Sequence, residues 1–288
     1  MNRVAWTRRW MPSGAVLLAL TCAINACPPC ARADEAAEKK GAALMNKYVE
    51  VTGGKAAYEA IKSRTLKGSR VMPGGQTVKF ESYWVSPNKF RHIMDLPNGT
   101  LERGSDGKTV WIIFPAEVTI QGAQRSEVTI FEGAQRVAAI RDSSQEKFGC
   151  WSSIFQKAEY VDDEDVDGTK CSKVALTYKP IDPDVIEPPM TVFIAQDSGL
   201  IVKWTNEYTD KSAEGEASVV VTIRLSDYRK VGDVRVPHQM MVSFQDDELA
   251  TKVEEIVFNA DIPADKFALP ERVKKELESQ AAQSKAKK

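Results

Sequence analysis

The sequence has little histidine and cysteine, and most of its cysteine lies at one end. It holds two His and five Cys in 288 residues, and Cys22, Cys27 and Cys30 fall within the first 33. Zinc and redox centres need several such side chains close together. Nucleophile-elbow, phosphate-loop, His-Glu-x-x-His and Cys-x-x-Cys motifs are also missing after residue 33. We therefore expect no metal site, no cofactor and no catalytic residues, so that the protein is not an enzyme.

A basic surface and long apolar runs are lacking too. The first 33 residues hold four arginines and no acid, which leaves 35 Lys and Arg against 40 Asp and Glu in the rest, a net charge of −5. Domains that bind nucleic acid normally show a basic face, so no nucleic-acid partner is expected. After the N-terminus no stretch of about 18 apolar residues could span a bilayer.

Residues 1–33 have the three parts of an export signal. Arg3, Arg8 and Arg9 precede an apolar run from Ala15 to Ile24, and Ala31-Arg32-Ala33 fits the small-x-small cleavage pattern. We expect this segment to be a signal peptide and the mature protein to be periplasmic. Two alternatives share the segment: lipidation at Cys27 in an imperfect lipobox, and twin-arginine export.

Two cysteines remain in the mature chain, Cys150 and Cys171. An even number of cysteines outside the cytosol usually pairs, so we predict a disulfide between them. The alternative is two buried thiols.

Apolar periodicity divides the chain into a helical start and a long β region. Residues 36–61 have helical spacing interrupted at Gly53-Gly54, which predicts two helices. From Ser63 the period changes to two, as in Phe90, His92, Met94 and Leu96 on one face of a strand. Alternation with one apolar face is typical of an antiparallel sheet that is covered on that face only.

Turn signals separate the strand-like runs at six places, each containing a glycine that can supply positive φ. They are Gly74-Gly75, Asn98-Gly99, Asp106-Gly107, Asp167-Gly168, Ser198-Gly199 and Gly232-Asp233.

Residues 131–157 interrupt the strands with a helical pattern, and the charged residues 271–288 are expected to form a short solvated helix or a frayed tail. We therefore expect a single mainly β (α+β) domain over residues 34–270, with a large curled antiparallel sheet.

Two motifs resemble the periplasmic outer-membrane lipoprotein carrier family (LolA-like). They are Tyr83-Trp84-Val85-Ser86-Pro87-Asn88-Lys89-Phe90 and Ser105-Asp106-Gly107-Lys108-Thr109-Val110-Trp111. The segment from Pro263 to Pro270 is similar to the closing segment of that family. Residues 49–66 also resemble the related outer membrane lipoprotein-sorting proteins.

The resemblance implies an unclosed half-barrel whose apolar concave face is covered by helices. It implies a monomer that holds the acyl chains of a lipoprotein, or another lipid, and passes them from an inner-membrane donor to an outer-membrane acceptor. Carriers of this family place an Arg directly before the Pro of the first motif, where it latches the lid. Here Ser86 occupies that position.

Aromatic and methionine side chains are the candidates for lining such a cavity, since methionine adapts to variable ligands. They are Trp84, Phe90, Met94, Trp111, Phe193, Trp204, Met240 and Phe244. The alternative is that they fill an ordinary β core.

His92 and His238 alternate in phase with apolar residues and are expected to be core histidines. Residues 163–168 begin like a calcium loop, but Val174 stands at its twelfth position, so we expect an acidic hairpin turn.

Three functions follow from these features. The first is a non-enzymatic periplasmic carrier or chaperone for lipoprotein acyl chains, under a displaceable N-terminal helix pair. The second is a binding or sensing module of the same fold that signals to an envelope partner without transferring cargo. The third is a secreted hydrolase, for which no motif gives support.

Overall fold

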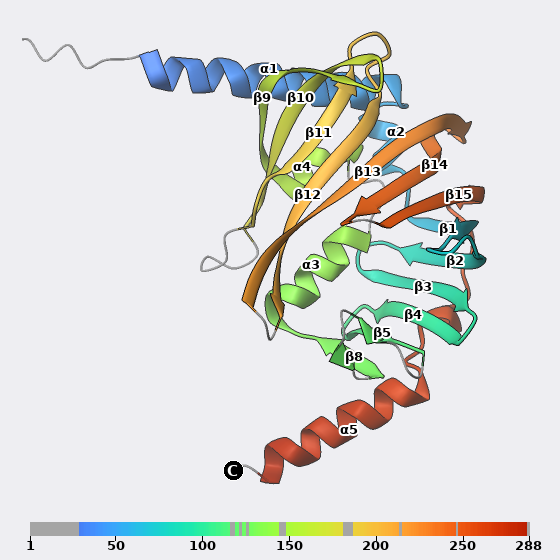
Figure 1. The fold of residues 1–288 in the computed structure, drawn as a ribbon. Coiled ribbons are helices and arrows are strands. Elements are labelled where there is room, and N and C mark those ends of the chain that lie inside the picture. Colours follow the sequence, from blue (N-terminus) through green and yellow to red (C-terminus); the bar gives the residue numbers. More distant parts are fainter. Residues whose placement is uncertain are drawn as a thin grey trace, which may run out of the picture.

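A computed structural model describes residues 29–115, 119–120, 123–124, 127–143, 148–180, 187–212, 215–245 and 247–286 of the chain. Its dominant element is one antiparallel sheet of 13 strands that curls strongly but does not close (Figure 1). A separate two-stranded hairpin consists of β6 (Thr119–Ile120) and β7 (Ala123–Gln124). The predicted mainly β, unclosed half-barrel is confirmed.

The first half of the sheet consists of β1 (Ser63–Val71), β2 (Thr77–Val85), β3 (Lys89–Leu96), β4 (Gly99–Asp106), β5 (Val110–Ile113) and β8 (Val128–Phe131). The second half consists of β9 (Phe155–Val166), β10 (Thr169–Tyr178), β11 (Met190–Ala195), β12 (Ile201–Ser212), β13 (Gly215–Val231), β14 (Val234–Phe244) and β15 (Asp247–Phe258). The helices are α1 (Pro29–Val51), α2 (Lys55–Glu59), α3 (Gly133–Ser143), α4 (Trp151–Ile154) and α5 (Glu271–Ala286), with a 3₁₀ helix η2 (Ala264–Phe267) before α5.

The strand order follows two meanders that meet in the middle of the sheet. It runs β8-β5-β4-β3-β2-β1-β15-β14-β13-β12-β11-β10-β9. The first and last strands of the chain therefore pair with each other, with Arg64 opposite Phe258 and Leu66 opposite Ile256. The edge strands β8 and β9 flank the segment that carries α3 and α4, so the predicted helical insertion is confirmed and connects the two edges.

All six glycine-containing turns predicted from the sequence connect consecutive strands of the sheet. Between β9 and β10 both turn residues have positive φ, 51° at Asp167 and 83° at Gly168. Such a turn matches the twist of a two-residue hairpin and favours glycine. Residues 163–168 thus end a strand and form the expected acidic hairpin.

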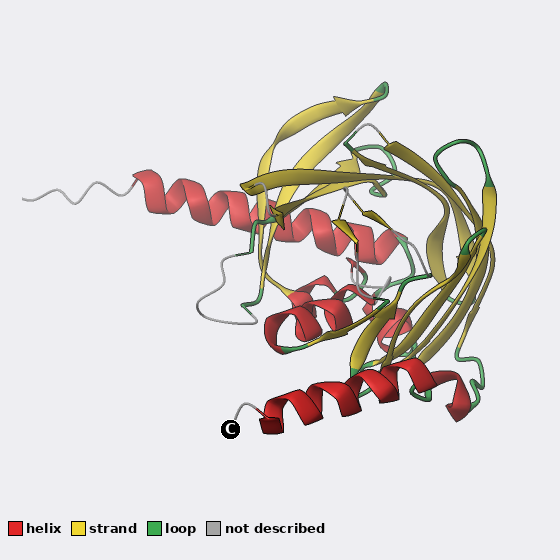
Figure 2. Ribbon diagram, turned by 60° about the horizontal axis from the view of Figure 1, so that its bottom comes forward, coloured by secondary structure: helices red, strands yellow, loops and turns green. Residues whose placement is uncertain are grey.

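The N-terminal helix α1 packs closely against edge strand β9 (Figures 1 and 2). A Cβ at Gly41 would lie 2.5 Å from the backbone oxygen of Ala158, so a residue with a side chain could not take its place without a shift. The Lys40 ammonium lies 3.2 Å from the ring centroid of Tyr160, and the Lys157 ammonium lies 2.9 Å from the Glu38 carboxylate. The break between α1 and α2 falls at Gly53-Gly54, as predicted.

Helices cover both faces of the sheet, but unequally. Figure 2 shows α3 inside the curl and α5 outside it. Helix α5 is anchored by Val273, which is fully buried and packs with Trp111, Ile113 and Val128. The helix expected at residues 271–288 is present, but it is docked on the sheet and not simply solvated. Among the described residues, no helix is long and apolar enough to cross a membrane.

Candidate functional site

The sheet has an inner face, toward α3 and α4, and an outer face, toward α5. Residues directly opposite each other on neighbouring antiparallel strands share a face, and alternate residues along a strand do too. Phe80 lies opposite Met94, Trp84 opposite Phe90, and Met240 opposite Leu225 and Thr251. These pairings allow each side chain of the sheet to be assigned to one face.

The inner face is lined by a large apolar cluster under the helices. The helices contribute Met45, Tyr48, Val49, Tyr58 and Ala139 to it, and the strands contribute Trp84, Phe90, Val110, Phe155, Ala158, Val174, Leu176, Tyr178, Met190, Val192, Ile194, Ile201, Leu225 and Val234. Half-buried side chains extend it over β12, β13 and β14: Trp204, Ile223, Tyr228, Val236 and Met240.

A second apolar cluster continues along the same face and consists of Leu66, Val78, Phe80, Met94 and Val253. Met240 packs against both clusters and joins them into one apolar surface. The side chains of Ile223, Met240, Val242 and Phe244 keep part of their area exposed. The inner face is therefore an apolar concave surface that its helices do not fully bury.

Six of the eight predicted cavity residues lie on this inner face. Trp84, Phe90 and Met94 are 9%, 5% and 3% exposed and form part of the buried clusters. Trp204, Met240 and Phe244 are partly exposed. The exposed fraction thus separates the first three, which serve as core, from the other three, which a ligand can reach.

The prediction was wrong for Trp111, which lies on the outer face beneath α5. Its ring packs with Ile113, Val128 and Val273, and its indole N–H donates to the Glu102 carboxylate at 3.1 Å. Its neighbour Val110 faces inward. Both residues are apolar because helices cover both faces of the sheet here.

The prediction was also wrong for Phe193. It packs on the outer face with Val166, Cys171 and Ala195, and the Lys203 ammonium lies 3.8 Å from its ring centroid. The adjacent Val192 and Ile194 belong to the inner cluster. Strand β11 is apolar on both faces, so alternation could not indicate which face Phe193 takes.

The predicted disulfide is not formed in the structure. Cys150 packs against the inner cluster beside α4, whereas Cys171 is fully buried on the outer face of β10. Burial raises the pKa of the Cys171 thiol. The two cysteines lie on opposite faces of the sheet, which keeps their sulfur atoms apart.

Helix α3 is less deeply embedded than the N-terminal helices α1 and α2. Ala139 is its buried residue, and Val137 is 41% exposed. By contrast, Met45, Tyr48 and Tyr58 of α1 and α2 are 5% exposed or less. The N-terminal helix pair, which the sequence analysis expected to be displaceable, is thus more deeply packed than α3.

Polar contacts at both ends hold α3. The Arg136 guanidinium donates to the Lys108 carbonyl at 2.6 Å, and Arg141 makes two hydrogen bonds to Glu187, at 2.8 and 2.9 Å. Ser86, at the position of the family's latching Arg, is exposed between β2 and β3.

Sequence reasoning missed three arginines on the inner face: Arg64, Arg70 and Arg103, here called the arginine cluster. Arg103 lies opposite His92, and His92 lies opposite Ser82. Burial, then the charges of Arg70, Arg103 and Arg64, lower the pKa of His92 to about 4. The sequence did contain a signal for this cluster. Arg64 and Arg70 each stand an even number of positions from Leu66, so they lie on the same face of the strand as Leu66.

His238 is buried as expected, with Nδ1 3.1 Å from the Val236 carbonyl oxygen.

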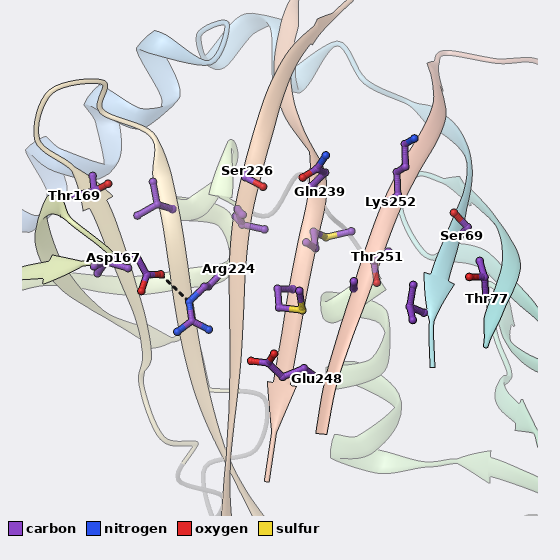
Figure 3. A pocket seen from close by; sticks show the side chains of 17 residues that line it. Ser69, Thr77, Asp167, Thr169, Arg224, Ser226, Gln239, Glu248, Thr251 and Lys252 are labelled. Atoms are coloured by element: carbon purple, nitrogen blue, oxygen red, sulfur yellow. Dashed lines mark hydrogen bonds and ion pairs between the residues drawn. The ribbon is translucent and has the colours of Figure 1, made fainter. Parts of the chain in front are cut away.

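The structure also has a groove of about 790 Å³ on the outer face of β12 to β15 and β1 (Figure 3). Arg224 binds Asp167 across this groove at 3.0 Å. Its lining mixes polar side chains, such as Ser226, Gln239 and Lys252, with apolar ones, such as Val166, Met240 and Met241.

Neither a family model nor a curated protein sequence matches the chain. Among solved structures, a LolA superfamily protein from Nitrosomonas europaea superposes with a TM-score of 0.50 at 12% identity, over 80% of this chain and 97% of that one. A DUF1329 family protein from Desulfovibrio piger gives 0.48 at 13%, covering 79% and 97%. An outer membrane lipoprotein-sorting protein domain from Vibrio parahaemolyticus gives 0.46 at 13%, covering 77% and 97%. The first of these superpositions shows that the chain has a LolA-like fold.

Proposed function

We propose that this protein is a non-enzymatic periplasmic carrier or chaperone that holds lipid or lipoprotein acyl chains on its inner face. The observation that carries the proposal is the apolar surface formed by both inner clusters, of which Ile223, Met240, Val242 and Phe244 remain partly exposed. Soluble proteins bury such surfaces unless they bind something apolar.

The energetics suit reversible binding. Each methylene group removed from water contributes about 0.8 kcal/mol, so an acyl chain binds without a covalent step. Release requires that the covering element moves. Helix α3 meets this requirement because polar contacts at its two ends, and few buried side chains, hold it in place.

The route of the cargo belongs to the same proposal. A signal peptide at residues 1–33 would deliver the protein to the periplasm. There it would act as a monomer, receiving lipoprotein from an inner-membrane donor and passing it toward an outer-membrane acceptor. Lipidation at Cys27 would instead anchor it to a membrane.

The test is native mass spectrometry of residues 34–288 purified from a bacterial periplasm, followed by organic extraction. Wild-type protein should carry lipid or lipoprotein. Met240→Glu should abolish this, because it places a charge between the two inner clusters. Met241→Glu is the matched control: it is also partly exposed and lies on the same strand, but it faces outward opposite Arg224.

Circular dichroism of both variants separates a lost ligand from a lost fold. The proposal fails if the wild-type protein is empty and also takes up no fluorescent fatty acid. That result would favour the alternative, a module of this fold that binds an envelope partner without cargo, and co-purification of such a partner would then be expected.

A further inference from the structure

Asn206 is a polar side chain among the apolar side chains of the inner face. It lies on β12 two residues after Trp204, which belongs to the large inner cluster. Across the sheet it is opposite Val221, and Val221 is opposite Phe244. Because alternate residues along a strand and directly opposite residues on neighbouring strands share a face, the Asn206 side chain points inward with them.

The carbonyl oxygen of this side chain lacks a hydrogen-bond donor. Asn206 is 7% exposed, and its Oδ1 atom is buried and accepts no hydrogen bond from any residue that the structure describes. Two other polar groups of the inner face are paired: the Tyr228 hydroxyl donates to the Ile201 carbonyl at 2.7 Å, and Arg70 Nε donates to the Thr251 hydroxyl at 2.9 Å. A buried acceptor without a donor costs free energy, which a ligand that supplies the donor would recover.

The surface beside Asn206 is apolar and partly exposed. Val221 and Phe244, in register with Asn206, and their inward neighbours Ile223 and Val242 each keep part of their area exposed. The last torsion angle of an asparagine side chain has a broad range, so the amide can turn its oxygen toward this surface at little cost. A ligand that lies on these side chains can therefore reach Asn206.

From Asn206 the apolar surface continues along β13 and β14, which lie side by side (Figure 1). Ile223 lies opposite Val242, and Leu225 lies opposite Met240, which joins the two inner clusters. A molecule whose head contacts Asn206 can therefore lay its acyl chain over Ile223 toward Met240.

We propose that Asn206 accepts a hydrogen bond from the ligand of the inner face, and that this ligand is an acyl compound with an N–H or O–H donor beside its chain. This inference rests on the proposed function and names its class of cargo. A secondary amide and a hydroxyl are the neutral groups that supply such a donor. A ligand without a donor would leave Oδ1 unpaired and bind less tightly.

The test uses two pairs of ligands that differ in the donor. N-methyldecanamide has an N–H that N,N-dimethyldecanamide lacks, and decanol has an O–H that its methyl ether lacks. Each ligand displaces a fluorescent fatty acid from the protein purified from a bacterial periplasm, and the ratio of the two affinities is measured for each pair. The pair in which wild type favours the donor identifies that donor as N–H or O–H.

Asn206→Leu removes the acceptor and keeps an apolar side chain of similar length. In at least one pair the ratio in favour of the donor should be at least about fivefold larger in wild type than in this variant, the lower end of what pairing a buried acceptor contributes. Comparing ratios between proteins cancels the hydrophobicity of the additional methyl group. Asn206→Ala repeats the comparison with a smaller side chain, and Asn206→Asp should keep the preference because a carboxylate also accepts the hydrogen bond.

Thr205→Val is the matched control. It removes a polar group from the adjacent residue, which points to the outer face opposite Thr222, and should leave both ratios at their wild-type values. Equal ratios in wild type, Asn206→Leu and Asn206→Ala overturn this inference alone, as does a loss of preference in Thr205→Val. If neither the fluorescent fatty acid nor any of the four ligands binds, the proposed function and this inference fail together.

Discussion

His92 and the arginine cluster place ionisable side chains where the alternation of β1, β3 and β4 requires aliphatic ones. His92 packs against Phe80, with ring centroids 5.4 Å apart, and its burial together with neighbouring positive charge favours the neutral imidazole. A neutral His92 can accept a hydrogen bond without adding to the repulsion among the arginines. Protonation would place a fourth positive charge on the same surface.

The pH dependence of the unfolding free energy should reveal the cost of protonating His92. The pKa of His92 is about 4 in the folded protein against about 6.5 in the unfolded chain, so the unfolded chain binds the extra proton between these values. Stability should therefore fall as pH is lowered from 6.5 to 4, by on the order of 3 kcal/mol, and this residue should have no effect above pH 7. Urea unfolding of wild type and His92→Gln at each pH isolates the contribution. An identical pH slope in both proteins would contradict it.

Helix α3 contributes Ala139 to the inner cluster, and polar contacts near both of its ends also hold it in place. Its C-terminal end depends on Arg141, which is bonded to Glu187 and lies with its guanidinium 3.8 Å from the ring centroid of Tyr178. Arg136 holds the other end to the β4–β5 hairpin. Ion pairs of this kind break more readily than a packed apolar helix face, so they suit an element that opens.

Glu187→Gln should loosen α3. We expect a loss of about 1–3 kcal/mol in unfolding free energy, because the partly buried Arg141 loses a charged acceptor. Amide hydrogen exchange should accelerate in residues 133–143 while β9 and β10 stay protected. Asp162→Asn, at an exposed carboxylate 3.9 Å from Lys173, is the control and should leave exchange in α3 unchanged. Unaltered exchange in α3 after Glu187→Gln would argue against a fastening role for the pair.

Helix α5 is a structural element of the outer face, since Val273 covers Trp111. Val273→Ala should lower the unfolding free energy by roughly 1–3 kcal/mol, because it leaves a cavity against Trp111 and Ile113. Lys275→Ala, at an exposed position of the same helix, should change it little. Tryptophan fluorescence during unfolding provides the measurement. Equal effects of the two substitutions would mean that α5 does not cover the sheet in solution.

At the scale of the whole molecule, the two meanders depend on each other through the β1–β15 pairing. The inner surface exists only once this pairing is made, because β14 and β15 contribute Met240 and Val253 while β1 to β3 contribute Leu66, Phe80 and Met94. A ligand bound there contacts both halves of the chain and therefore stabilises the entire fold.

Ligand should accordingly raise the stability of the whole chain as a unit. At a free lipid concentration 100 times Kd, unfolding should cost about 2.7 kcal/mol more. Thermal unfolding with and without lyso-phosphatidylglycerol should remain a single transition that shifts upward in wild type and Met241→Glu, and not in Met240→Glu. Light scattering should show one chain per particle throughout. A shift of the same size in Met240→Glu would place the lipid elsewhere on the molecule.

The sequence by itself determined the features that depend on neighbouring residues. Alternation at Phe90, His92 and Met94 predicted an inward strand face, and Asp167-Gly168 predicted a hairpin, because side-chain period and positive φ are local properties. The helix break at Gly53-Gly54 followed for the same reason. The half-barrel architecture came from the resemblance carried by residues 83–90 and 105–111, since strand periodicity is compatible with a barrel or a sandwich as well.

The tertiary structure decided which face each side chain takes where both faces are covered. Trp111 and Phe193 lie in runs that are apolar on both sides, so only the docking of α5 and the register of β10 to β12 place them outward. The separation of Cys150 from Cys171 depends likewise on which cluster each joins. The arginine cluster formed only when pairing of β1 with β2, and of β3 with β4, brought residues far apart in the chain onto one inner surface.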